Sequence, residues 1–132
     1  MKIPILKLGS ILLTSISEEM TDEDALDFQN DVLERVNKTE ASGVVIDITA
    51  LEVVDSFLAR VINDTAKMVR LLGAEVVLCG MRPSVALTLV EMGRELIGVK
   101  ASLDLEQGVA ELHACIRAGN AASGDGRSKR NQ

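Results

Sequence analysis

The first sixteen residues contain two short apolar runs with a polar break between them. Residues 3–8 and 11–16 are apolar runs, and Gly9 and Ser10 join them. A two-residue connection that begins with Gly is typical of a type II′ β-hairpin. The pattern therefore predicts two antiparallel strands at the start of the chain.

The next segment has the spacing of a helix. Thr21 and Asp24 stand at the two positions of a capping box, although Asp replaces the preferred Glu. Acidic residues crowd the first turn, where the helix dipole favours them. Apolar residues then recur every three or four positions, at Ala25, Phe28, Val32 and Val36. We expect an amphipathic helix that begins after Thr21.

Three strand–helix units follow. Continuous apolar runs at 43–48 and 74–80 and a weaker one near 99–101 predict buried strands. The first of the following helices has a broad apolar face, made of Phe57, Leu58, Val61, Ile62, Thr65, Met68, Val69 and Leu72. Its polar face holds Arg60, Asn63, Asp64, Lys67 and Arg70, and Gly73 ends it.

Two more helices are predicted in the C-terminal part of the chain. Pro83 suits the first turn of a helix that Gly93 closes. Asp104 caps a helix that runs to about Ala118, with Val109, Leu112 and Ile116 facing inward. Residues 118–132 are rich in Gly, Ser, Asn and charge, so we expect a disordered tail there. The order predicts an α/β fold, in which a mixed sheet packs against about four helices in a single domain over residues 1–117.

Composition narrows the class of function. The 132 residues suit one domain, the net charge is -6, and aromatic residues make up only 2%. Stacking platforms and a basic surface for nucleic acid are therefore not expected. The chain has one His, and its two cysteines, Cys79 and Cys115, stand in apolar surroundings. We expect free cysteines, no metal site and no cofactor, and a cytoplasmic protein without a membrane span.

Asp55 and Ser56 stand between a predicted strand and a predicted buried helix. Either side chain can cap that helix by accepting a hydrogen bond from a free N–H group. A helix N-terminus also accommodates a phosphate, so a cap and a phosphorylation site are compatible at this place. A third hypothesis is that Ser56 is the nucleophile of a small hydrolase. Ser56 lacks the flanking glycines of a nucleophile elbow, and the only available base is His113, in the last predicted helix.

Several segments resemble one known family in order. The stretch "VVIDITALEVVDSFLARVI" resembles the signature of STAS domains, in which an Asp-Ser pair opens the second helix. "KIPILKLGSILLTSI", "LLGAEVVLCGMRPSVALTLVEMG" and "LDLEQGV" resemble the RsbS branch of that family, so the resemblance covers residues 1–117. Simple STAS antagonists carry Gly after the Ser pair, whereas Phe57 and Leu58 follow Ser56 here, which favours the RsbS branch.

The resemblance implies a switch that is not an enzyme. RsbS-like proteins assemble with RsbR-type paralogues into the stressosome, a large cytoplasmic complex that sequesters an RsbT-type serine/threonine kinase. Phosphorylation at the position of Ser56 releases the kinase, and an RsbX-type phosphatase resets it. Thr88 is a minor candidate for a second phosphorylated residue. Asp55, Phe57 and Arg60 are expected to contact the kinase, and the chain is expected to form a homodimer within the hetero-oligomer.

One alternative function shares this fold. A free anti-sigma factor antagonist would also carry the phosphoserine, but it would bind an anti-sigma kinase one-to-one. The size of the assembly separates that alternative from the stressosome hypothesis. The hydrolase alternative belongs to another class and would require turnover of a substrate.

Overall fold

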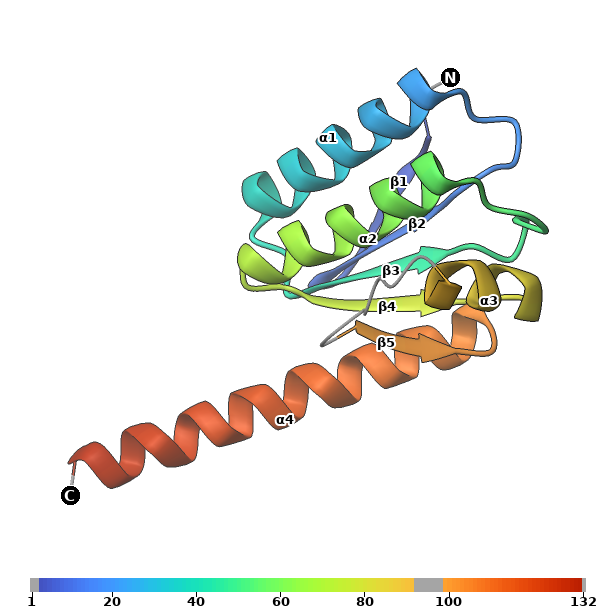
Figure 1. The fold of residues 1–132 in the computed structure, drawn as a ribbon. Helices are drawn as coiled ribbons and strands as arrows, with labels where there is room; N and C mark the ends of the chain where they lie inside the picture. Colours follow the sequence, from blue (N-terminus) through green and yellow to red (C-terminus); the bar gives the residue numbers. More distant parts are fainter. Residues whose placement is uncertain (1–2, 92–98, 132) are drawn as a thin grey trace.

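The computed structural model describes the backbone of residues 3–91 and 99–131, and the side chains of residues 3–91 and 100–119. Nine elements follow one another along these residues (Figure 1). They are β1 (Ile5–Leu8), β2 (Ile11–Ser15), α1 (Asp22–Thr39), β3 (Gly43–Asp47), α2 (Ser56–Leu71), β4 (Glu75–Cys79), α3 (Pro83–Glu91), β5 (Val99–Ser102) and α4 (Leu105–Asn131). The predicted order of strands and helices is confirmed.

The strands form one mixed sheet in the order β1-β2-β3-β4-β5. β1 pairs antiparallel with β2, and the remaining neighbours are parallel. Leu8 pairs with Ile11, so the hairpin loop is the predicted two residues, and Gly9 has a φ of 61°. Ser10 is not among the residues with positive φ, as a type II′ turn requires of its second position. The mixed α/β sheet that the sequence predicts is therefore present.

Helices cover both faces of the sheet. α1 and α2 lie on one face and α4 lies on the other, while α3 packs beside α2 (Figure 1). Successive residues of β3 separate the two layers, because Val44 and Ile46 join the core under α1 and α2 whereas Val45 packs on the α4 side. A central strand that is buried on both faces explains the continuous apolar run around residues 43–48.

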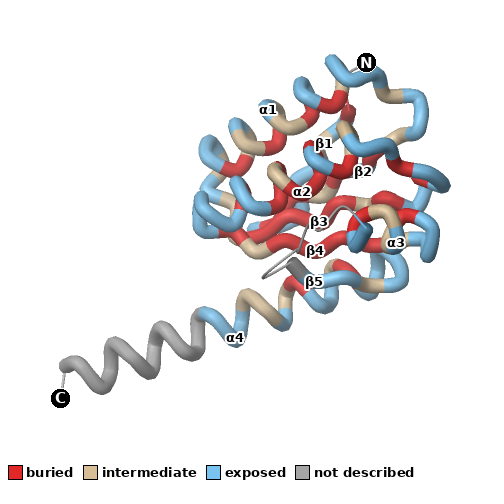
Figure 2. The backbone as a smooth tube through the Cα atoms, in the orientation of Figure 1, coloured by how far each residue is buried: buried red, intermediate tan, exposed pale blue. Residues whose placement is uncertain are grey.

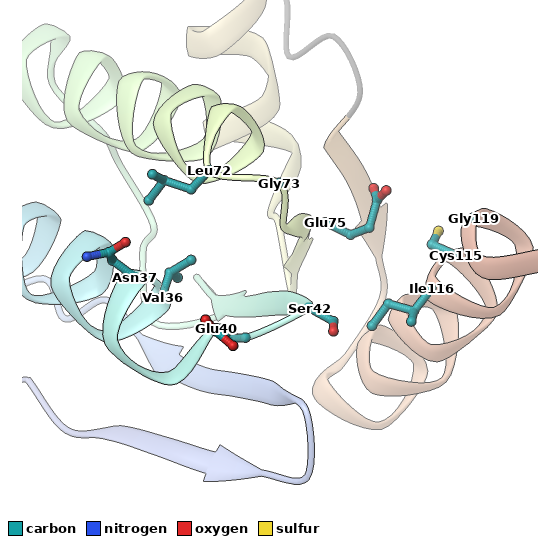
Figure 3. A pocket seen from close by; sticks show the side chains of 11 residues that line it. Val36, Asn37, Glu40, Ser42, Leu72, Gly73, Glu75, Cys115, Ile116 and Gly119 are labelled. Carbon is teal, nitrogen blue, oxygen red and sulfur yellow. The ribbon is translucent and has the colours of Figure 1, made fainter. Parts of the chain in front are cut away.

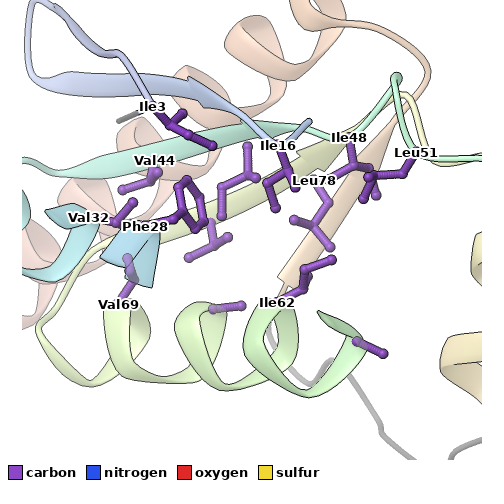
Figure 4. Packing of buried hydrophobic residues seen from close by; sticks show 14 of the residues in the cluster. Ile3, Ile16, Phe28, Val32, Val44, Ile48, Leu51, Ile62, Val69 and Leu78 are labelled. Carbon is purple, nitrogen blue, oxygen red and sulfur yellow. The ribbon is translucent and has the colours of Figure 1, made fainter. Parts of the chain in front are cut away.

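The larger core lies between the sheet and the pair α1 and α2. Figure 4 shows Phe28 and Val32 of α1 and Ile62 and Val69 of α2 directed toward the apolar strand residues. The buried residues follow the strands and the inner faces of these helices (Figure 2). All four apolar residues predicted for the inner face of α1 are buried, and Thr21 and Asp24 form the predicted capping box.

The smaller core lies under α4. Leu112 is fully buried, and Val109 and Ile116 pack partly buried against the same cluster, as predicted. Gly43 lets the helix approach closely, since a Cβ there would lie 2.7 Å from a methyl carbon of Leu112. Asp104 caps α4 by accepting a hydrogen bond from the N–H of Gln107 at 2.8 Å.

The structure corrects the predicted faces of α2. Asn63, expected on the polar face, is fully buried, and neither of its side-chain polar atoms has a hydrogen-bond partner. Met68 and Leu72, expected in the core, are 38% and 50% exposed. α2 packs against the sheet, α1 and α3. Its buried face is therefore wider than the single apolar stripe that the sequence predicts.

The end of the last helix also differs from the prediction. α4 continues to Asn131, beyond the expected end near Ala118, and its C-terminal part extends past the sheet (Figure 1). A helix satisfies its own backbone hydrogen bonds, so it can continue where nothing packs against it.

Both cysteines are free; Cys79 is buried and Cys115 is half-buried. Burial raises the pKa of the Cys79 thiol to about 12, and the carboxylates of Asp47 and Asp104 add to this. Gly93 lies outside the described residues.

Gly80 is expected to tolerate no side chain. Its φ is +76°, and an added Cβ would lie 1.9 Å from Oγ1 of Thr49. Gly80→Ala should therefore lower the free energy of unfolding by about 3 kcal/mol, through backbone strain and steric overlap together. Gly9→Ala is the matched control, because Gly9 also has positive φ but has nothing within 4 Å of an added Cβ. Chemical denaturation of both variants measures the two losses; equal losses would contradict the steric contribution.

Candidate functional site

Asp55 is the residue that caps α2. Its φ and ψ are −79° and 174°, and its carboxylate Oδ1 accepts a hydrogen bond from the N–H of Leu58 at 2.8 Å. Its carbonyl oxygen accepts the first helical bond, from the N–H of Ala59 at 3.0 Å. The sequence left open which of Asp55 and Ser56 caps the helix, and the geometry assigns this to Asp55.

Ser56 is the first residue of α2 and is exposed. Within the described residues its hydroxyl has no hydrogen-bond partner. The first turn of a helix carries N–H groups without helical partners and a partial positive charge. An added anionic group on this hydroxyl can therefore be accommodated while Asp55 keeps the cap.

The other two residues of the predicted site lie in the same two turns. Phe57 is half-buried and Arg60 is exposed, one helical turn beyond Ser56. Val53, in the preceding loop, is 78% exposed, although Leu51, two residues before it, and Val54, directly after it, are buried. Val53 is not among the residues that the sequence predicts for this site. The N-terminal end of α2 thus presents a hydroxyl, a carboxylate, a guanidinium and exposed apolar atoms together.

Asp55 provides the first stability test of this site. Asp55→Ala should lower the free energy of unfolding by about 1 kcal/mol, because it removes the capping oxygen. Asp55→Asn keeps an oxygen for the N–H of Leu58 and should lose less than half as much. Urea denaturation of the two variants measures the difference. An equal loss in both would mean that the charge of Asp55, and not its cap, stabilises α2.

Thr88, the minor candidate, has a different environment. It is half-buried in the middle of α3, and its hydroxyl donates to the carbonyl oxygen of Ser84 at 3.1 Å. This bond lies within one helix. The Thr88 hydroxyl therefore has a hydrogen-bond partner, whereas the Ser56 hydroxyl has none among the described residues.

His113 does not meet Ser56. His113 belongs to α4, which packs against β3, β4 and β5 on one face, whereas α2 packs on the other face. The sheet therefore separates the imidazole from the hydroxyl. A Ser–His pair for nucleophilic catalysis is not formed by this arrangement.

A cavity of about 450 Å³ lies near the start of β3 and β4, at the end of the sheet away from Ser56 (Figure 3). Val36 and Leu72, near the C-terminal ends of α1 and α2, and Cys115 and Ile116 of α4 line it. Ser56 is at the other end of the 16-residue helix α2, about 24 Å away along its axis. The cavity is thus not part of the Ser56 site.

Among the residues that the structure describes, no cluster of three or more His, Cys, Asp or Glu side chains could hold a metal ion. No helix in this part of the chain is long and apolar enough to cross a membrane.

Comparison with known proteins places the chain in a family. The sequence model of the STAS domain matches residues 2–107. RsbRA of Bacillus subtilis, an RsbT co-antagonist protein, is 37% identical over 87 residues, which are 66% of this chain and 32% of that protein. The chain thus matches about a third of the length of that relative.

Two solved structures are similar over nearly the whole fold. A serine-to-glutamate variant of RsbS from Moorella thermoacetica is 38% identical, with a TM-score of 0.81, and the match covers 89% of this chain and 99% of that one. A chain from a structure of the stressosome, described as a signal integration and transduction hub, is 39% identical, with a TM-score of 0.78 and coverage of 86% and 99%. The chain belongs to the STAS-domain family and is similar to its RsbS members.

Proposed function

We propose that this protein is a non-catalytic, phosphorylation-switched scaffold of a stressosome. It assembles with an RsbR-type STAS paralogue in a large cytoplasmic complex, within which it forms homodimers. The complex sequesters an RsbT-type serine/threonine kinase. Phosphorylation of Ser56 releases the kinase, and an RsbX-type phosphatase removes the phosphate.

The exposed hydroxyl of Ser56 at the start of α2 is the observation that carries the proposal. A kinase can reach this hydroxyl without unfolding the helix, since Asp55 and not Ser56 provides the cap. The phosphate would add about -1.5 to -2 charge at pH 7 beside the Asp55 carboxylate. The chemical change is therefore large at the surface and small within the fold.

The likeness to known proteins supports the same proposal. The Moorella RsbS relative carries glutamate in place of a serine, a change that adds a negative charge, and another relative is a chain of a stressosome structure. The RsbRA and RsbRD proteins of Bacillus subtilis are both described as RsbT co-antagonists, at 37% and 32% identity. These names support an RsbR-type paralogue and an RsbT-type protein as the partners of the proposal.

The surface around Ser56 suits the kinase contact. Asp55 and Phe57 are the chain neighbours of Ser56, Arg60 lies one helical turn beyond it, and Val53 adds an exposed apolar side chain. Any kinase that modifies Ser56 must cover these neighbours while its active site reaches the hydroxyl. We therefore assign the contact with the kinase to this end of α2.

Sedimentation of a reconstituted mixture tests the assembly. The chain, an RsbR-type paralogue and an RsbT-type kinase are mixed without ATP, and all three should sediment in one complex far larger than any of them. Adding ATP should move the kinase to the slow fraction and leave the two STAS proteins together. A complex of only one chain and one kinase would instead support a free antagonist.

A further inference from the structure

Two segments that are distant in the sequence contact Glu52, in the loop between β3 and α2: one contains Glu18, the other Arg82 and Ser84. Its N–H donates to Oε1 of Glu18 at 2.8 Å, and its carbonyl oxygen accepts from the hydroxyl of Ser84 at 2.5 Å. Its carboxylate Oε1 lies 3.8 Å from a guanidinium nitrogen of Arg82. The N–H, the carbonyl oxygen and the carboxylate of Glu52 are therefore each in contact with one of these two segments.

Arg82 holds the loop at a second place. Its Nε donates to the carbonyl oxygen of Thr49 at 3.1 Å, three residues before Glu52. The ion pair with Glu52 is about half exposed, so on its own it adds little stability. The bond to the Thr49 carbonyl gives the guanidinium a fixed position, from which one side chain bridges two points of the loop. We name the contacts of Arg82 and Ser84 with Thr49 and Glu52 the α3 clamp.

The clamped loop leads directly to the candidate site. Glu52 precedes Asp55 by three residues, and the intervening Val54 is buried. The chain has little slack between the clamp and the cap, so the path of the Glu52 peptide determines how Ser56 is presented at the start of α2. Loss of the clamp is therefore expected to change the presentation of Ser56, while the buried Leu51 and Val54 keep the loop attached to the core.

We propose that Ser84 and Arg82 are positioning residues for Ser56. They act through Glu52 and Thr49, and they hold the loop in the conformation that a kinase recognises. The inference rests on the proposed function only for the role of Ser56; the clamp itself is a property of the free chain. Docking then selects the clamped conformation, so loss of the clamp raises KM while kcat stays the same.

Thr88 offers a matched control on the same helix. Its hydroxyl donates to the carbonyl of Ser84 within α3, whereas that of Ser84 reaches across to the loop. Thr88→Val and Ser84→Ala each remove one hydroxyl from α3, but only the second opens the clamp. Ser84→Thr keeps a hydroxyl at the clamp and serves as the conservative rescue.

Amide hydrogen exchange of the unphosphorylated chain tests the clamp. In Ser84→Ala, exchange at the amides of Leu51 and Glu52 should be about fivefold faster, the change expected for one net hydrogen bond. Ser84→Thr and Thr88→Val should exchange like the wild type. Unchanged exchange in Ser84→Ala would overturn the clamp.

Steady-state phosphorylation with a purified RsbT-type kinase tests the positioning role. Ser84→Ala and Arg82→Gln should raise KM about threefold or more at unchanged kcat, with thermal midpoints close to that of the wild type. A KM like that of the wild type in the presence of faster loop exchange would overturn the positioning role. A kinase that leaves wild-type Ser56 unmodified would contradict the proposed function instead, and amide exchange would then decide on the clamp alone.

Discussion

Ser56→Ala is expected to abolish the dominant phosphate that an RsbT-type kinase and ATP place on this chain. The wild type should gain one phosphate, because the Ser56 hydroxyl is exposed and without a partner among the described residues. The variant should keep its stability to within about 0.5 kcal/mol, since Asp55 retains the cap and Ala is a good helix former. Mass spectrometry of the intact protein and of its peptides measures both the number and the place of phosphates.

Thr88→Ala is the control for this experiment. It also removes one hydroxyl from a helix, but that hydroxyl is bonded within α3, so the phosphate on Ser56 should remain. Denaturation curves of the two variants show whether any loss of phosphate arises from unfolding. Phosphate found mainly on Thr88 or on Ser84 would contradict the assignment to Ser56.

The sequence pattern was sufficient for the fold because each element carries its own local signal. The helical spacing of Phe28 and Val32, the Gly-first hairpin loop and the capping box of Thr21 all depend on near neighbours in the chain. The face of α2 depends on three other elements, so its pattern was interpreted wrongly at Asn63. Burial by several neighbours is a tertiary property that spacing along one helix does not show.

The candidate site was predictable only in its local part. Asp55 and Ser56 are adjacent, and a strand that leads into a helix indicates a cap. The contacts of Glu52 with Ser84 and Glu18 join residues more than thirty positions apart. The segment "MRPS" after a strand marks a turn, but nothing in its composition says which loop it meets. The residues of the clamp could therefore be identified only in the structure, where the carboxyl ends of β3 and β4 lie side by side.

The second large effect is expected in the affinity for the kinase. A phosphate on Ser56 places a strongly hydrated dianion beside Asp55, among the residues that we assign to the kinase contact. An uncompensated charge at an interface costs a few kcal/mol, which weakens binding on the order of ten- to several-hundred-fold. Phosphorylated protein should therefore release the kinase, and Ser56→Asp should release it in part, because one charge imitates the phosphate incompletely. Ser56→Ala should retain the kinase even after incubation with ATP.

Charge placed elsewhere on α2 is the control that distinguishes position from net charge. Leu71 is 86% exposed at the opposite end of the helix, so Leu71→Asp adds the same charge about 22 Å from the site. This variant should bind the kinase like the wild type, whereas Ser56→Asp should bind it more weakly. Calorimetry gives the affinities, and size-exclusion chromatography should show that the assembly with the paralogue survives Ser56→Asp and Ser56→Ala, because helix N-termini tolerate an added anion. Equal affinity of the kinase for Ser56→Ala and for the fully phosphorylated protein would mean that Ser56 is not the switch.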